Sequence, residues 1–244
     1  MIVIENIAQD SAPVTFTIDG VGLHGLLFED RAVKTHWLSL LGGCAEPEKG
    51  NIFFEKNGER LPVVAQRARI GYVPSSLVLY EDMTVLELLD FVAAAKGVLP
   101  DKRARQIKEA LELMGLTAHS HRLIALLSAQ NRLRLCFAQA VLGNPVLIVC
   151  DDPLGEGGTE QKRDVEDLLR MLARYKPIVL GSTTADILPL CHDVTVIGRE
   201  GVRYEGEAAA LLAKLTVSAT ATTQISVAEY FGFSVEEKED GACS

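Results

Sequence analysis

One stretch of the sequence decides the fold: Gly25-Leu-Leu-Phe-Glu-Asp-Arg-Ala-Val-Lys-Thr-His-Trp-Leu-Ser-Leu-Leu-Gly-Gly43. Its first residues continue an apolar run from Leu23 to Phe28, a pattern typical of a strand buried on both faces. A polar loop follows, and then apolar residues at helical spacing lead to Gly42-Gly43, which end a helix. A strand that runs into a turn, then Lys34-Thr35, then a helix is the arrangement of a phosphate-binding loop.

Strand and helix patterns continue on both sides of this stretch. Asn57-Gly58 lies between two apolar runs and predicts a hairpin. Further along, Val146–Cys150 predicts a buried strand that ends in Asp151-Asp152-Pro153, and Pro177–Leu180 predicts another strand. Strands that alternate with helices indicate an α/β fold with a mostly parallel sheet, here with an N-terminal antiparallel β part.

The middle of the chain carries helix signals and almost no strand signal. Thr84-Val-Leu-Glu87 is a capping box that opens one helix, and Ser128 precedes another. We therefore predict a single domain, 1–244, with an inserted helical part. Its predicted divisions are an α/β core at 1–75 and 146–216, a helical subdomain at 76–145 and a C-terminal extension at 217–244. Within the extension, Ile225–Phe233 suggests a short amphipathic helix.

Composition excludes several classes of function. The 244 residues carry a formal net charge of −9, which argues against nucleic acid as the main partner. Five scattered cysteines without a CxxC pair argue against disulfides and zinc and suit a reducing cytosol. His119 and His121 lack a third metal ligand nearby and favour a surface loop. No apolar run approaches the roughly 20 residues that cross a bilayer, so another chain would have to supply any membrane span.

The motifs together resemble the ATP-binding subunits of ABC transporters. Gly25–Gly43 resembles their Walker A region, with Lys34 and Thr35 at the lysine and hydroxyl positions. The other landmarks follow in the family's order over roughly residues 1–215: the hairpin Gly50–Gly58, the pre-Q-loop strand Ile70–Pro74, Leu127–Asn131 at the signature, Val146–Pro153 at Walker B and the closing hairpin Gly201–Gly206. The resemblance implies a P-loop NTPase fold of the ABC ATPase type.

The resemblance also implies roles for particular residues. Lys34, Thr35 and Ser128 would contact ATP, and the guanidinium of Arg31, although Arg31 replaces a family glycine, could add a bidentate contact to a phosphate. Thr35 and Asp151 would hold Mg²⁺. Asp152 stands where the family has the glutamate that polarises the attacking water. The implied partners are a membrane permease subunit, docked on the helical subdomain near Ser75, and a second ABC ATPase subunit in a homo- or heterodimer. The implied location is cytoplasmic, at the inner face of the cell membrane.

Several positions depart from the family pattern. The glycines of the phosphate-binding loop are replaced by Phe28, Arg31 and Val33. A backbone nest around phosphate needs positive φ, which would cost a β-branched residue such as Val33 on the order of 1–3 kcal/mol. Glu29 and Asp30 are expected to add two carboxylates beside the polyphosphate site. Further departures affect the Q-loop, signature, D-loop and H-loop, at Ser75, Ala129, Gln130, Gly158 and Thr184.

The residues leave alternatives open. Lys34 has two readings, a phosphate ligand or a solvated lysine lying over the helix, and Thr35 could be an ordinary first-turn residue. Asp151-Asp152-Pro153 could be a capping turn. Three functions follow: a degenerate subunit with weak or absent ATP hydrolysis that supports a transporter, a working ATP-hydrolysing subunit, or a non-transport scaffold. Because glycines are lost from both Walker A and the signature, pairing with an active subunit would weaken both composite sites.

Overall fold

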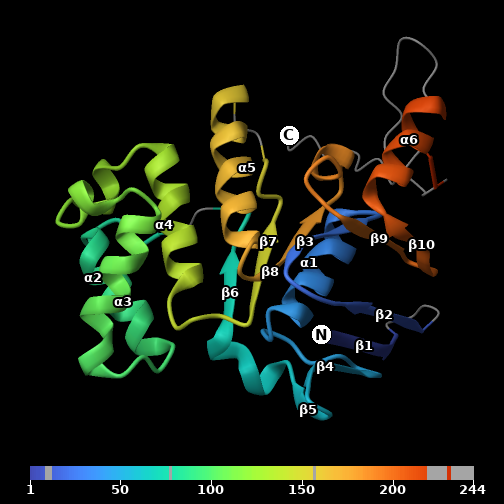
Figure 1. The fold of residues 1–244 in the computed structure, drawn as a ribbon, viewed down its shortest axis with the longest axis horizontal. Coiled ribbons are helices and arrows are strands. Elements are labelled where there is room, and N and C mark those ends of the chain that lie inside the picture. Colours follow the sequence, from blue (N-terminus) through green and yellow to red (C-terminus); the bar gives the residue numbers. More distant parts are fainter. Residues whose placement is uncertain (9–12, 77–78, 156–157, 219–229, 232–244) are drawn as a thin grey trace, which may run out of the picture.

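The computed structural model describes residues 1–8, 13–76, 79–155, 158–218 and 230–231. The expected helix at Ile225–Phe233 falls almost entirely outside these residues. No helix in the described ranges is long and apolar enough to cross a membrane. Figure 1 shows a group of helices on one side of a central sheet and a second, smaller sheet on the other side.

Two sheets form the framework. The smaller sheet is antiparallel and has the order β2 (Val14–Ile18), β1 (Ile2–Ile7), β4 (Asn51–Lys56), β5 (Glu59–Pro62). The larger sheet has the order β10 (Gly201–Glu207), β9 (Asp193–Gly198), β3 (Gly22–Phe28), β8 (Pro177–Ser182), β7 (Leu147–Asp151), β6 (Ile70–Val73). Its strands pair in parallel except for β9 with β10. The predicted fold class is confirmed.

Helices cover the larger sheet and lie between the two sheets. They are α1 (Arg31–Leu41), α2 (Val85–Ala95), α3 (Pro100–Leu113), α4 (Ala129–Val141), α5 (Thr159–Ala173) and α6 (Ala208–Ser218). Short 3₁₀ helices occur at η1 (Val64–Arg69), η2 (Thr117–His119), η3 (Ile124–Leu126) and η4 (Ala185–Ile187).

The strand β3 explains how both faces of the large sheet become buried. Successive side chains of a strand point to opposite faces. Leu26 and Phe28 belong to one core cluster with Trp37 of α1 and with the small sheet. Leu27 belongs to the other cluster, which includes residues of α2 to α6. The continuous apolar run therefore serves two cores, and α1 lies between the two sheets.

Two elements predicted from short sequence motifs occur in the structure. Thr84 and Glu87 form a complete capping box at the start of α2. Asn57 and Gly58 both have positive φ, 52° and 81°, as a two-residue hairpin between β4 and β5 requires. The second strand of this hairpin, β5, ends at Pro62, and η1 begins at Val64 and turns the chain toward β6.

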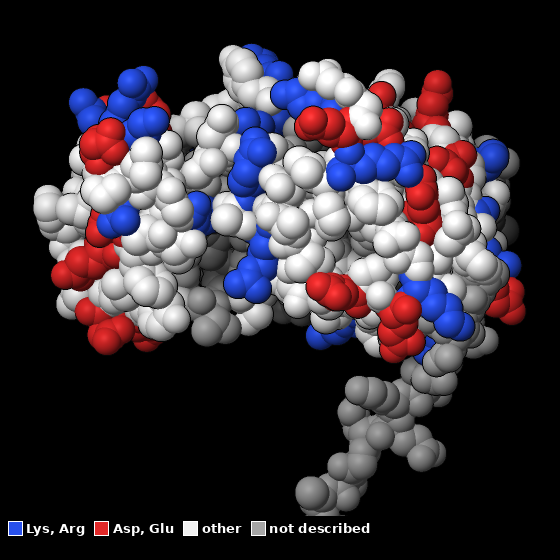
Figure 2. Space-filling view, turned by 90° about the horizontal axis from the view of Figure 1, so that it is seen from below, with Lys and Arg blue, Asp and Glu red and all other residues white. Residues whose placement is uncertain are grey.

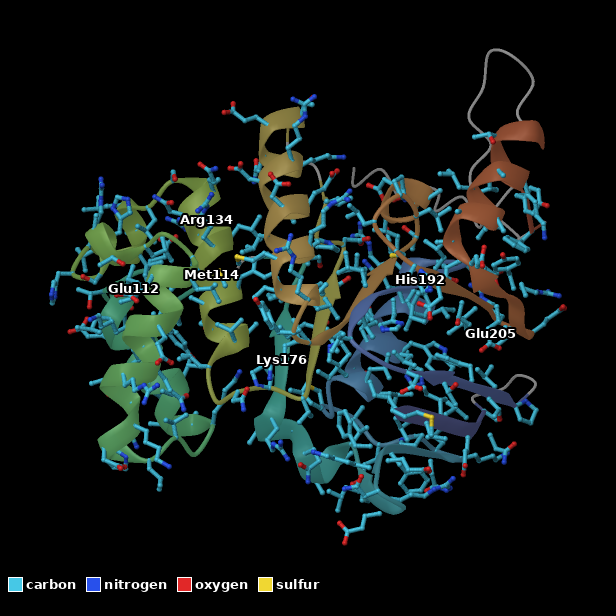
Figure 3. All side chains as sticks on the ribbon, viewed as in Figure 1. Glu112, Met114, Arg134, Lys176, His192 and Glu205 are labelled. Atoms are coloured by element: carbon cyan, nitrogen blue, oxygen red, sulfur yellow. The ribbon has the colours of Figure 1, made fainter. Side chains whose placement is uncertain are left out.

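The chain between β6 and β7 is helical, and polar contacts fasten its helices together. Arg134 of α4 donates to the Met114 carbonyl at the end of α3 over 3.1 Å, and Figure 3 shows these residues side by side. The partly buried Lys96 amine, at the end of α2, donates to three carbonyls near the end of α4. Figure 2 shows the molecule from below, and on this side positively and negatively charged side chains are mixed.

Candidate functional site

The site begins where β3 leads into α1. The strand ends at Phe28 and the helix begins at Arg31, so Glu29 and Asp30 alone join them. Asp30 is the N-cap, with extended backbone angles of φ −145° and ψ 173°, and its Oδ1 accepts a hydrogen bond from the Val33 N–H at 2.8 Å. Arg31 and Val33, which replace two loop glycines, are therefore ordinary helical residues. The helix occupies the part of the chain where the loop was expected.

The strain expected at Val33 is consequently absent. Among the described residues, the non-glycine residues with positive φ are Asn6, Asn57, Asn144 and Asp152. Without glycines the chain continues as helix, because that conformation has no steric penalty for a residue with a Cβ atom. The third replaced glycine, Phe28, is 1% exposed and packs in the core cluster that contains Trp37. The aromatic ring at this position, where the family has a glycine, therefore contributes to the hydrophobic core.

Glu29 and Asp30 face the turn between β9 and β10. The Arg199 backbone N–H donates to Glu29 Oε2 at 2.8 Å, and the Arg199 guanidinium donates to Asp30 Oδ2 at 2.9 Å. Burial by itself raises the pKa of Asp30, but hydrogen bonds from Val33 and Arg199 and the Arg199 charge lower the pKa below its ordinary value. Sequence analysis missed Arg199, because nothing local connects residues 169 positions apart.

Lys34 is buried in the first turns of α1. It is 2% exposed, and its ammonium forms ion pairs with Asp151, at 2.7 Å, and with Asp152. The reading of Lys34 as a solvated lysine over the helix is wrong. A buried ammonium needs opposite charges close by, and the two carboxylates after β7 supply them.

The two aspartates lie at the carboxyl end of β7. Asp151 ends the strand, is 9% exposed and accepts a 3.0 Å hydrogen bond from the Ser75 hydroxyl. Asp152 has φ 45°, and its backbone N–H donates to the Gly181 carbonyl at 2.8 Å. Burial, and then the charge of Asp151, raise the pKa of the neighbouring Tyr72 to about 12. The carboxylates of these two adjacent residues both form ion pairs with the Lys34 ammonium.

These side chains border a cavity of about 620 Å³. It brings together five of the six candidate residues: Arg31, Lys34, Thr35, Asp151 and Asp152. Arg31 and Thr35 are exposed there, and Ser75 joins them. Hydroxyls of Ser182 and Thr184 line another wall, where Thr184 donates to Asp186 at 2.5 Å. The cavity is polar and carries charges of both signs.

The sixth candidate, Ser128, has a different environment. It is the N-cap of α4, and its Oγ accepts a hydrogen bond from the Asn131 N–H at 3.2 Å. The neighbouring Gln130 donates to Asp164 of α5 in the same chain. His119, at the end of η2, and His121 form no group of three possible metal ligands in the described part of the chain.

Comparisons with known proteins agree on one family. The family model described as "ABC transporter" matches residues 13–155. The probable multidrug ABC transporter ATP-binding protein YbhF of Escherichia coli is 30% identical over 206 residues, covering 82% of this chain and 35% of YbhF. The uncharacterized ABC transporter ATP-binding protein YxlF of Bacillus subtilis is 28% identical, covering 80% of this chain and 64% of YxlF. The chain spans about a third of YbhF's length.

Solved structures show the same fold. The structure of cbiO1 from Clostridium perfringens, part of the ABC transporter complex cbiONQ, has a TM-score of 0.77 at 17% identity, covering 88% of this chain and 92% of that one. The dimeric bacterial ABC transporter cassette MJ0796 has a TM-score of 0.70 at 18% identity, covering 85% and 99%. The family model covers more than half of the sequence and the structures share its architecture, so the chain belongs to the ABC transporter family and has the fold of its ATP-binding cassette.

Proposed function

We propose that this chain is a degenerate ATP-binding-protein-like subunit of an ABC transporter. In this proposal its site binds Mg-ATP weakly or not at all, ATP hydrolysis is weak or absent, and the subunit acts as a structural or regulatory partner of a membrane transporter. The observation that carries the proposal is the start of α1 at Arg31, capped by the Asp30 carboxylate.

The start of α1 does not fit a polyphosphate. Phosphate binds at a helix N-terminus through free backbone N–H groups and the positive end of the helix dipole. Here the Val33 N–H already donates to Asp30, so the chain's own carboxylate takes the position of an anion. Arg31 and Val33 lie within the helix. The residues whose N–H groups would form a phosphate-binding nest, if they were glycines, are therefore already part of α1.

The carboxylates are not free for Mg²⁺ binding or general-base chemistry either. Asp151 and Asp152 both pair with the buried ammonium of Lys34. A general base must reach the proton that it removes, and Asp152 is directed instead at a cation within its own chain. It is also one methylene shorter than the family glutamate, a change that can displace a base by about 1 Å and reduce the rate perhaps 100-fold.

The proposed partners follow from the family. cbiO1 is part of a transporter complex and MJ0796 is dimeric, which supports a membrane permease subunit and a second ABC ATPase subunit as partners, in a homo- or heterodimer. The helical subdomain, 76–145, would dock the permease. It carries exposed apolar side chains, among them Tyr80, Phe91, Leu123 and Leu126. The chain would then lie in the cytoplasm at the inner face of the cell membrane.

One observation favours a working ATPase as the second candidate. The cavity of about 620 Å³ retains Lys34, Thr35 and Asp151 on one wall. MJ0796 has also been solved with ADP and Pi. If the Lys34 ion pairs opened and α1 unwound by a turn, these residues would become available to Mg-ATP. A scaffold outside transport is the third candidate, and co-purification of a membrane-spanning permease with the chain would argue against it.

ATP hydrolysis tests the proposal. Phosphate release with Mg-ATP is measured for the wild-type protein and for Lys34→Ala, purified in parallel so that contaminating ATPases are matched. We expect the same background rate from both preparations, because Lys34 is committed to Asp151 and Asp152. A wild-type rate well above that of Lys34→Ala would contradict the proposal and support the second candidate.

A further inference from the structure

A buried cluster of charge joins α1 to the end of β7. It consists of the Lys34 ammonium and the carboxylates of Asp151 and Asp152. The side chains of Lys34 and Asp151 are 3% and 12% exposed, whereas the side chain of Asp152 is 26% exposed. Two carboxylates that share one site repel each other, so a cation between them stabilises the charged form of both.

Backbone hydrogen bonds fix the chain on both sides of the contact between Lys34 and Asp152. Lys34 is a helical residue whose N–H donates to the Asp30 carbonyl at 3.0 Å, so the base of its side chain is fixed by α1. Asp152 takes φ 45°, a left-handed conformation that aspartate tolerates better than most residues, and a 2.8 Å hydrogen bond to Gly181 holds it. Both sides of the contact are therefore positioned by backbone hydrogen bonds.

The oxygen atoms around the ammonium are those that a hard divalent cation prefers. Mg²⁺ and Mn²⁺ bind carboxylates and other oxygen ligands. Asp151 Oδ1 is buried and, within the described part of the chain, has no hydrogen-bond partner, although the Lys34 nitrogen lies 2.7 Å away. Asp151 Oδ2 already accepts from the Ser75 hydroxyl, which fixes the orientation of the carboxylate. The charge of Lys34 satisfies Oδ1 without a directed hydrogen bond.

We propose that Lys34 is a tethered cation: its ammonium takes the place of a divalent metal ion between Asp151 and Asp152, and holds α1 against β7 without a ligand. This inference rests on the proposed function, because it explains how a cassette that binds no Mg-ATP keeps its carboxylate pair neutralised. It follows that the metal-binding capacity of the pair is masked, and that removal of the ammonium exposes it.

The test measures metal binding and thermal unfolding without nucleotide. Wild type, Lys34→Met and the control Lys162→Met are compared in EDTA and in millimolar Mn²⁺, with bound Mn²⁺ followed by EPR. Lys162 lines the same cavity, where its amine lies 3.9 Å from Asp186, so the control removes a lysine that does not bridge the pair. Met retains most of the length and apolar contact of the lysine stem.

We expect wild type and Lys162→Met to bind no Mn²⁺ and to unfold at the same temperature with and without the metal. Lys34→Met should unfold roughly 10 °C lower in EDTA, since the buried Asp151 carboxylate and the partly buried Asp152 carboxylate lose their counter-ion, and should recover part of that loss in Mn²⁺ with an EPR signal from bound metal. The double variant Lys34→Met/Asp152→Asn should be more stable than Lys34→Met in EDTA and should bind no Mn²⁺, a comparison that stands even if Lys34→Met folds poorly.

Binding of Mn²⁺ by the wild-type protein would overturn the inference, as would a Lys34→Met protein that is as stable as wild type and indifferent to Mn²⁺. So would a double variant no more stable than Lys34→Met. The proposed function fails separately, if the wild-type protein binds and hydrolyses Mg-ATP. A wild-type protein that does not bind Mg-ATP, together with no coupling between Lys34 and Asp152, would remove the tethered cation and leave the proposed function standing.

Discussion

The substitution Asp30→Ala tests whether the chain's own carboxylate fills the helix N-terminus where phosphate would bind. It removes the acceptor of the 2.8 Å hydrogen bond from the Val33 N–H and the partner of the Arg199 guanidinium. Loss of an N-cap costs about 1 kcal/mol. The Arg199 pair has side chains 51% and 31% exposed, so solvent screening reduces its contribution to a few tenths of a kcal/mol.

The sum is a loss of about 1.5 kcal/mol in the free energy of unfolding, measured by urea denaturation at pH 7. For a chain of this length that corresponds to a melting temperature lower by about 4 °C. Asp30→Asn is the matched control, because asparagine still caps the helix but carries no charge. It should lose less stability than Asp30→Ala.

The pH dependence has a definite sign. The folded-state pKa of Asp30 lies below its ordinary value of 3.8, so the carboxylate contributes stability above that value and loses it as the pH falls through the folded pKa. The difference between wild type and Asp30→Ala should therefore narrow below about pH 4. Inorganic phosphate should stabilise Asp30→Ala and leave wild type unchanged, because the variant has the freed N–H. An Asp30→Ala protein as stable as wild type, or a wild-type protein stabilised by phosphate, would refute this reasoning.

Three further substitutions probe the surrounding framework. Phe28→Gly should cost about 3–5 kcal/mol in urea denaturation and restore no Mg-ATP binding in a titration, because the buried ring leaves a cavity and α1 remains capped. Lys96→Met should cost about 2–3 kcal/mol by the same assay, since three carbonyls, at 2.9, 3.1 and 3.1 Å from the amine, lose their donor. Gly181→Ala should cost about 1–3 kcal/mol and lower the melting temperature in calorimetry, because the new Cβ would lie 2.7 Å from two methyl carbons of the fully buried Leu38. A wild-type free energy of unfolding in any of the three would count against the corresponding contact.

Features with a local cause could be predicted from the sequence. The capping box Thr84–Glu87 and the hairpin at Asn57-Gly58 are each set by a few neighbouring residues, and both occur in the structure. The cap at Asp30 has the same local character: an aspartate directly before helical residues is a known start signal.

Features that depend on distant residues could not be predicted. The partners of Lys34 lie 117 and 118 positions further along the chain, and only the approach of α1 to the end of β7 brings them together. A lysine at a helix start has the same local pattern whether it is solvated or buried. The Arg199 contact with Glu29 and Asp30 likewise arises from the pairing of β3 with β9, which no short-range pattern specifies.

Titration of the purified protein with Mg-ATP in an isothermal calorimeter tests the central claim, that the chain's own side chains fill this site, most directly. With Asp30 capping α1 and Lys34 held by Asp151 and Asp152, we predict no saturable binding by the wild-type protein up to millimolar nucleotide. Micromolar binding by wild type that Lys34→Ala abolishes would contradict the account.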